Sequence, residues 1–180
     1  MTNGSPGDRK QAFSAIEKLT KDHDVSFFDC GKPSLNDWLR RFALTNQQSD
    51  SSRTYVLHRA GKVVAYYSLS AGAVRKEESP ARVAKGLAKH PIGVILLARL
   101  AVDQNEHGTG LGKAMLVDAL SRALLAADAI GARAILVHAI DEEAAAFYRK
   151  FGFEPSPLAP KQLMLLMKDL RASLKPLGSR

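Results

Sequence analysis

The chain has 180 residues, the size of one domain, and 46% of them are hydrophobic, enough for an ordinary buried core. Its 26 Lys and Arg against 18 Asp and Glu give a net charge of +8, which favours polyanionic partners such as nucleic acid, an acidic protein or a phosphorylated cofactor. No apolar run approaches the ~18 residues of a membrane span, and the N-terminus lacks the apolar stretch of a secretory signal. Cys30, the one cysteine, excludes an intrachain disulfide and a cysteine-rich metal site. We expect a cytoplasmic protein with no membrane partner and no metal.

The N-terminal third predicts a strand, a helix and a hairpin. Residues 1–10 are polar with Gly and Pro and predict a flexible terminus before a single domain at 11–175. An edge strand is expected at 12–19, and a turn at 31–34 places Ser34 as the N-cap of a helix. That helix has an apolar face at i, i+3, i+4, i+7, and two Val- and Tyr-rich segments separated by Ala60-Gly61 form the hairpin. The face comprises Leu35, Trp38, Leu39 and Phe42, a polar break follows at 46–52, and the hairpin strands are 53–59 and 62–70.

A short basic helix and a buried strand come next. Ser79-Pro80 is typical of an N-cap with Pro at the first helical position, in a helix that extends to Lys89. The run IGVILLARLAV at 92–102 predicts a central buried strand. A glycine-rich loop at 107–112 then leads into a helix that ends near Ile130, with Gly131 as the C-cap.

The C-terminal third predicts a strand at 134–139, a helix that Asp141 caps and Gly152 ends, and a last strand at 162–168. Elements in this order pack as an α/β (α+β) domain, with a mixed central sheet and helices on both faces.

The glycine loop, His107-Gly108-Thr109-Gly110-Leu111-Gly112, follows a buried strand and opens a helix. Glycines let the main chain approach a ligand, and the first turn of a helix has unpaired N–H groups, so the arrangement suits a pyrophosphate. A Walker A loop would need a hydroxyl residue where Ala114 stands, and a Rossmann loop would need GxGxxG. A simple strand-to-helix turn remains an alternative on the loop alone.

A second motif, DEEAAAFYRKFGF at 141–153, follows the loop, and with both motifs the sequence resembles the GNAT acetyltransferases. Their pyrophosphate loop reads [Q/R]-x-x-G-x-G/A, matched by residues 107–112, and their later helix reads A-x-x-F-Y-x-x-x-G-F, matched from Ala144 to Phe153. The departure is His107, where the family has Gln or Arg. Since His can donate an N–H to phosphate, we expect weaker or pH-dependent cofactor affinity rather than loss.

The GNAT resemblance implies an acetyl-CoA site at a splayed strand and direct attack by an amine. Main-chain groups of the strand would pair with the pantetheine arm and polarise the thioester carbonyl, an effect worth ~3–4 kcal/mol in acyl transfer. Tyr148 would protonate the departing thiolate, although a Tyr on an apolar helix face also serves as core. The implied acetyl-CoA residues are Leu100, Ala101, Val102, His107, Gly108, Thr109, Gly110, Leu111, Gly112 and Lys113.

Further segments are similar to the TacT-type GNAT toxins of type II toxin–antitoxin systems, over roughly residues 20–170. That resemblance implies acetylation of the α-amino group of aminoacyl-tRNA, which blocks translation. It also implies a ribbon–helix–helix antitoxin, operator DNA bound indirectly through that antitoxin, and a homodimer. The similar segments are 28–31, 35–39, 53–56, 65–69, 95–103 and 137–139.

An aminoacyl-tRNA acceptor agrees with the absence of an obvious general base. A peptide α-amine has a pKa of about 8 and the neighbouring ester lowers it, whereas a lysine amine has a pKa of about 10.4. His138 lies at a strand end, where a plain core or strand-end role is at least as favoured as a catalytic one.

Basic side chains gather before and within the short predicted helix, which places three of them on one face. Such clusters are usually only solvated surface, but with the net charge and the resemblance they favour contact with the tRNA backbone, which weakens with salt. The candidates are Arg75, Lys76, Arg82, Lys85 and Lys89, with Arg40, Arg41 and Arg99 as lesser ones.

Two rival functions stay open. One is a GNAT enzyme that acetylates protein or small-molecule amines and binds no RNA. The other is a binding module of a toxin–antitoxin–DNA complex in which acetylation is weak or absent.

Overall fold

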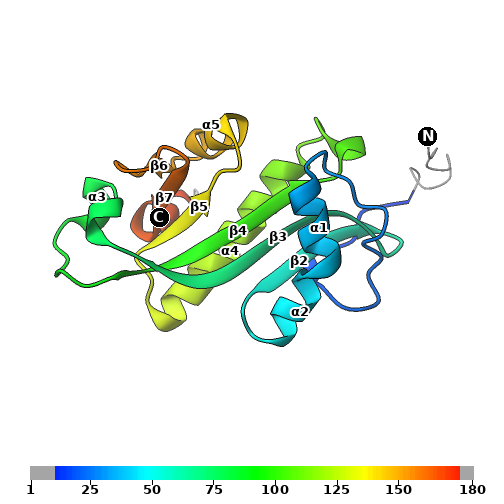
Figure 1. The fold of residues 1–180 in the computed structure, drawn as a ribbon, viewed down its shortest axis with the longest axis horizontal. Helices are drawn as coiled ribbons and strands as arrows, with labels where there is room; N and C mark the ends of the chain where they lie inside the picture. The colour runs from blue at the N-terminus through cyan, green and yellow to red at the C-terminus, as the bar shows by residue number, and fades with distance from the viewer. Residues whose placement is uncertain (1–10, 175–180) are drawn as a thin grey trace, which may run out of the picture. The chain divides into compact units, whose positions relative to one another are not determined.

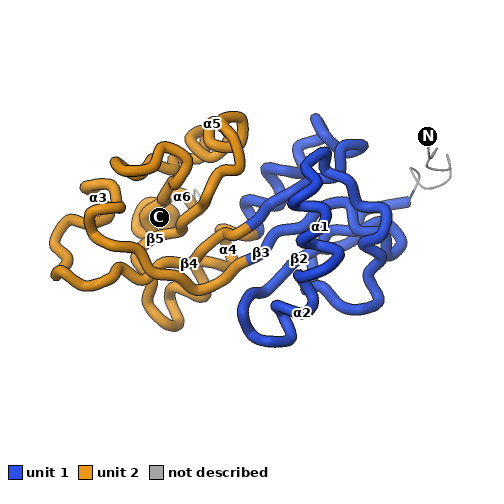
Figure 2. Tube along the Cα trace, in the orientation of Figure 1, with its two compact units in different colours: residues 1–68, 99–118 blue, residues 69–98, 119–180 orange. Residues whose placement is uncertain are grey.

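The computed structural model describes residues 11–174, which form two compact units. Among the described residues, unit 1 comprises 11–68 and 99–118, and unit 2 comprises 69–98 and 119–174 (Figure 2). Three elements, β3, β4 and α4, run through both units. Figure 1 labels the elements, which are β1 (Glu17–Lys18), α1 (Pro33–Arg41), α2 (Ala43–Gln48), β2 (Arg53–Arg59), β3 (Lys62–Val74), η2 (Lys76–Glu78), α3 (Ala81–Ala84), β4 (Ile92–Val102), η3 (Gln104–Glu106), α4 (Leu111–Ile130), β5 (Ala134–His138), α5 (Glu142–Lys150), β6 (Glu154–Pro155), β7 (Gln162–Leu166) and α6 (Met167–Ser173).

The predicted mixed sheet is confirmed, with strand order β1-β2-β3-β4-β5-β7-β6. β1 pairs with β2 and β5 with β7 in antiparallel register, whereas β4 and β5 are parallel. The parallel register ends at Leu97 and Val137, while β4 continues to Val102. β4 therefore extends beyond the last residue pair that it shares with β5.

Helices cover both faces of the sheet in unit 1, and two adjacent tyrosines show it. Successive side chains of a strand point to opposite faces. The Tyr66 hydroxyl donates to Leu35 O in α1 at 2.7 Å, and the Tyr67 hydroxyl donates to Asp118 Oδ2 in α4 at 2.5 Å. α1 and the start of α4 consequently lie on opposite sides of β3.

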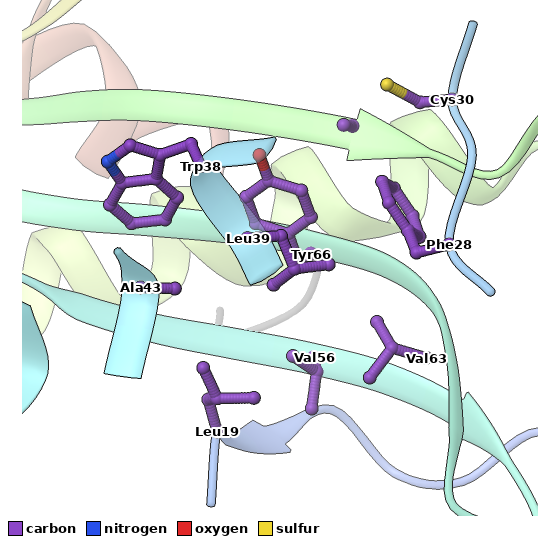
Figure 3. Close-up of a cluster of buried hydrophobic side chains, with 10 residues drawn as sticks. Leu19, Phe28, Cys30, Trp38, Leu39, Ala43, Val56, Val63 and Tyr66 are labelled. Carbon is purple, nitrogen blue, oxygen red and sulfur yellow. The ribbon is translucent and has the colours of Figure 1, made fainter. Parts of the chain in front are cut away.

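The apolar core of unit 1 fills the space beneath α1 (Figure 3). The pleats of β2 and β3 alternate buried residues with more exposed ones over part of their length, so that their inward side chains meet the apolar face of the helix. The predicted helix stripe is confirmed at Trp38 and Leu39, which are buried. This core comprises Leu19, Phe28, Cys30, Trp38, Leu39, Ala43, Val56, Val63, Tyr66 and Ala101.

Unit 2 has its own core, between β3, β4, β5, β7 and the short helix α3. The Asp141 carboxylate accepts from Ala144 N at 2.8 Å and starts α5, and Gly131 at φ +81° ends α4, so both predicted caps are confirmed. Within residues 11–174 no helix is both long and apolar enough to cross a membrane.

The helix predicted at 80–89 is wrong, because α3 ends at Ala84. Lys85 has extended backbone (ψ 128°), and Gly86 has φ +77°, a left-handed conformation that stops the helix. Ser79 is not its N-cap, since its hydroxyl donates to Arg75 O instead. The basic residues beyond Ala84 therefore do not share a helical face with Arg82.

Four smaller expectations also differ from the structure. Since Pro suits the first helical position, α1 begins at Pro33 and Ser34 is not its cap. Phe42 is 46% exposed because the chain turns there into α2, which occupies part of the predicted polar break. The edge strand shrinks to β1, and the last strand gives way to α6 at Met167. The predicted flexible segment 1–10 and residue 175 lie outside the described residues.

Asp103 holds the end of β4 in place. Its buried carboxylate accepts from Asp29 N at 3.0 Å and Asn105 N at 2.9 Å, and its own N–H donates to Val64 O at 2.8 Å. The two oxygens thereby join β4 to η3 and to the segment before α1.

We expect Asp103→Ala to lower the free energy of unfolding by about 2 kcal/mol, because two N–H groups near the buried position lose their acceptor. Urea denaturation measures this change. Asp22→Ala is the control, since Asp22 is exposed and its carboxylate has no partner among residues 11–174. Equal stability of the two variants would contradict the assigned role of Asp103.

Candidate functional site

The glycine loop lies in unit 1, largely exposed, between η3 and α4. Gly108 has φ +77° and Gly110 has φ +83°, and a Cβ at either position would meet nothing within 4 Å. The two glycines are thus required by the left-handed backbone and not by crowding. Ala114 N donates to Gly110 O, so the N–H groups before it belong to the first turn of α4, which has no partners inside the helix. The loop has the geometry of an anion site.

Two side chains of the loop bond to the protein's own main chain. The His107 ring lies with Nε2 2.8 Å from Val102 O, and since a carbonyl only accepts, Nε2 carries the proton. The Thr109 hydroxyl donates to Glu106 O at 2.6 Å. Sequence reasoning missed these contacts. They hold the loop against the end of β4 and leave the binding of an anion mainly to main-chain N–H groups.

The remaining predicted cofactor residues of unit 1 lie on both sides of this loop. Leu100 and Val102 are partly buried in β4, and Ala101 packs into the core beneath α1, so Ala101 can offer a ligand only its main chain. Lys113 is exposed in the first turn of α4, next to Leu111 and Gly112. Residues 100–113 therefore form one continuous segment of strand end, loop and helix start.

Tyr148 lies in unit 2, on the buried face of α5. Its side chain packs against Phe147 and Phe153, with ring centroids 5.3 and 5.4 Å away, and the residue is 7% exposed. Its hydroxyl has no hydrogen-bond partner among residues 11–174, yet it is not an enclosed unsatisfied atom, so it reaches solvent. Burial raises the pKa of Tyr148 well above its ordinary value. The hydroxyl therefore stays protonated at neutral pH and can donate to a ligand.

His138 ends β5, opposite Gln162 of β7, and is exposed. Of the core and strand-end roles open to it, the strand-end position is the observed one.

One group of side chains within residues 11–174 has the spacing of metal ligands, Glu17, His23 and His58. Both rings donate from Nε2 to Glu17 Oε1, at 2.7 and 2.8 Å, and these bonds lower the pKa of Glu17. Each Nδ1 accepts a main-chain N–H, from Thr20 at 2.9 Å and Gly61 at 3.0 Å. A metal on Nε2 would move the proton to Nδ1, where it would face an N–H donor. The group is better explained as a closed hydrogen-bond network.

Three of the five predicted tRNA-binding cations are engaged within the chain. Arg82 bonds to Asp169 at 2.7 Å and to Glu154 at 3.0 Å, and Arg75 pairs with Glu78 at 3.0 Å. Lys76 Nζ donates to Leu87 O at 2.7 Å. Lys85 and Lys89 are exposed, and their side chains have no polar partner among the described residues. These two lysines are the members most available to a polyanion.

Comparison with known proteins identifies relatives. The acetyltransferase (GNAT) domain family matches residues 50–155. A tRNA-acetylating toxin of Mycobacterium tuberculosis (strain ATCC 25618 / H37Rv) is 50% identical over 160 residues, which cover 89% of this chain and 96% of the toxin.

Two solved structures are similar across the same span. AtaT complexed with acetyl-methionyl-tRNAfMet has a TM-score of 0.84 at 27% identity, covering 91% of this chain and 100% of that one. A Tyr-to-Phe mutant of AtaT bound to the C-terminus of the antitoxin AtaR and acetyl-CoA has a TM-score of 0.77 at 27% identity, covering 91% of this chain and 98% of that one.

The Tyr66 hydroxyl has a hydrogen-bond partner and the Tyr148 hydroxyl has none among residues 11–174, so their removal should change the free energy of unfolding to different extents. We expect Tyr66→Phe to cost about 1 to 2 kcal/mol of unfolding free energy, because Leu35 O loses its 2.7 Å donor. Tyr148→Phe should cost less than about 0.5 kcal/mol, since its hydroxyl has no partner among residues 11–174. Chemical denaturation of both variants makes the comparison, and a larger loss for Tyr148→Phe would reveal a structural bond at that hydroxyl.

Proposed function

Because this chain belongs to the GNAT acetyltransferase family, we propose that it is a toxin that transfers the acetyl group of acetyl-CoA to the α-amino group of aminoacyl-tRNA, and so blocks translation. The observation that carries this proposal is the 50% identity, over nearly the whole chain, with a tRNA-acetylating toxin. Support from structure comes from the likeness to AtaT with acetyl-methionyl-tRNAfMet.

Different segments of the chain suit different parts of acetyl-CoA. The N–H groups at the start of α4, with Gly108 and Gly110 letting the main chain approach, suit the pyrophosphate. Main-chain groups of Leu100 and Val102 suit the pantetheine arm, because β4 has passed its last β5 pair there. His107 Nε2 donates to Val102 O, so the expected His107–phosphate contact requires either a turned ring or a doubly protonated one that donates from Nδ1.

Acetyl transfer then requires one bond to form and one to break. The amine nitrogen attacks the thioester carbonyl, the C–S bond breaks, and the thiolate takes a proton. Tyr148 is suited to donate that proton, because burial keeps the hydroxyl protonated and no residue of 11–174 competes for it. The amine loses its own proton to solvent, and since an aminoacyl amine titrates no higher than ~8, much of it is already neutral near pH 7.

The partners follow from the family resemblance. A ribbon–helix–helix antitoxin neutralises the toxin and carries it to operator DNA, and the toxin acts as a homodimer in the cytoplasm. The likeness to AtaT bound to the C-terminus of AtaR supports the antitoxin part of this proposal.

Transfer to charged tRNA is the decisive test. Purified protein is incubated with labelled acetyl-CoA and a pool of charged tRNA, and base then releases the amino acids. We expect N-acetylated amino acids in the released fraction, and Tyr148→Phe should lower kcat by about 10²- to 10⁴-fold while acetyl-CoA binding persists.

Two results would support the rival functions. Acetyl-CoA consumed only when peptides or small amines are supplied would indicate another GNAT activity. Toxicity on expression that survives Tyr148→Phe would favour a binding module that does not act through this tyrosine.

Lys85 and Lys89 test the tRNA contact. We expect the double variant Lys85→Gln/Lys89→Gln to bind tRNA more weakly than the wild type. The slope of the logarithm of the association constant against the logarithm of the salt concentration should become shallower by about 0.9 for each phosphate that is no longer neutralised. Fluorescence anisotropy over a salt series measures both quantities. Lys168→Gln, which removes an exposed charge from α6, should leave the slope unchanged, and an identical effect of the two changes would mean that only net charge matters.

A further inference from the structure

Arg99 of β4 stacks on Trp38, the only tryptophan of the protein. The Arg99 guanidinium carbon lies 4.3 Å from the centre of the Trp38 ring. Trp38 in turn stacks on Tyr66, with ring centroids 6.0 Å apart and planes 12° apart. Figure 3 shows these two rings side by side in the core of unit 1. Because the Tyr66 hydroxyl donates to Leu35 O at 2.7 Å, the base of the stack is held in one position.

Arg99 differs from the other arginines of residues 11–174 in being partly buried without a hydrogen-bond or ion-pair partner. Arg41 also has no such partner there, but it is exposed and lies over the Phe42 ring. Every other arginine in that range has an interaction partner. Those that bond to a carboxylate or a carbonyl oxygen are Arg40, Arg53, Arg59, Arg75, Arg82, Arg133, Arg149 and Arg171.

A partly buried guanidinium without a counter-charge is costly, because it loses water and gains no anion. The same desolvation lowers the pKa of Arg99, although the group stays charged. The Trp38 ring compensates in part through a cation–π contact. Stacking also holds the flat guanidinium in one orientation and leaves its N–H edge for an acceptor, which is the form that binds phosphate with two hydrogen bonds.

The glycine loop does not account for this missing anion. Arg99 lies over Trp38 of α1, and Tyr66 points to that same face of β3. The loop opens α4, and α4 contacts β3 through Tyr67, on the opposite face. The helix that the loop opens therefore packs on the face of β3 opposite Arg99, which favours the second substrate as the source of an anion for Arg99.

We infer that Arg99, oriented by Trp38, binds a backbone phosphate near the aminoacylated end of the acceptor RNA. This inference rests on the proposed function and adds a residue that positions the RNA on the α1 face of unit 1. Arg99 acts there as a positioning residue, since the reacting amine and thioester are served by other groups.

The experiment uses the full chain and two ligands, uncharged tRNA and acetyl-CoA. Because Trp38 is the only tryptophan, its fluorescence reports directly on an anion that binds the guanidinium stacked on it. Arg99→Gln removes both the charge and the paired N–H donors of the guanidinium, whereas Arg99→Lys keeps the charge and loses the paired donors. Arg171→Gln is the control, because it removes an exposed charge from α6. Thermal melting confirms that each variant is folded.

We expect tRNA to change Trp38 fluorescence in the wild type. In Arg99→Gln the dissociation constant for tRNA should rise about tenfold or more, with an intermediate rise in Arg99→Lys. The dissociation constant for acetyl-CoA should stay within about twofold for all variants, and the salt slope for tRNA should fall by about 0.7 to 0.9 in Arg99→Gln only.

Three results would overturn the inference. Equal weakening by Arg99→Gln and Arg171→Gln would show a general effect of charge, and weakened acetyl-CoA binding in Arg99→Gln would assign the anion to the cofactor. Unchanged tRNA binding in a folded Arg99→Gln variant would exclude the contact. None of these three results would contradict the proposed function. A wild-type protein that neither binds nor acetylates charged tRNA would instead remove the proposed function itself.

Discussion

The hydrogen bonds of Asp103 fix the place where β4 ends, and the rest of unit 1 depends on that point. One carboxylate oxygen meets the segment before α1 and the other starts η3, while the N–H of the same residue meets β3. The glycine loop follows within a few residues, and His107 bonds back to Val102. Strand end, loop and helix start are thereby held together by short local contacts, so the loop is positioned before any ligand arrives. Preorganised main-chain donors of this kind lose little entropy on binding.

The sequence predicted those parts of the structure that depend on residues close together in the chain. The buried strand at Ile92–Val102, the caps at Asp141 and Gly131, and the glycine loop were all predicted, because each rests on a periodicity or on the chemistry of one residue. The helix to Lys89 failed because a glycine with positive φ at Gly86 outweighed a regular charge pattern. Pairing of Arg82 with Asp169, far along the chain, could not be seen from spacing at all.

The candidate site shows the same division. Tyr148 and the loop could be named from motifs, but the state of the Tyr148 hydroxyl depends on neighbours that only the fold supplies. Phe147 and Phe153 exclude water from the ring, and no residue of 11–174 takes the hydroxyl proton in a hydrogen bond. A raised pKa keeps the Tyr148 hydroxyl neutral at pH 7, so that this side chain is a hydrogen-bond donor there and not a base. Because the acceptor amine of the proposed reaction is largely neutral at pH 7, its attack on the thioester needs no general base. Neither that attack nor the protonation of the thiolate then requires a carboxylate or a histidine.

Net charge counts side chains, whereas binding depends on which of them are unpaired. The excess of +8 favoured the basic residues from Arg75 to Lys89 as an RNA contact, yet Arg75 and Arg82 are neutralised by acidic neighbours. Arg99 adds one charge to the count, but it is partly desolvated and has no hydrogen-bond or ion-pair partner among the described residues, so it is more informative than a cluster. Exposed lysines lose little when an RNA leaves, because water replaces the phosphate. Water can replace a lost phosphate only in part at a guanidinium that is stacked on an indole and partly buried. The free N–H groups of that guanidinium therefore both attract an anion and fix the orientation in which it binds.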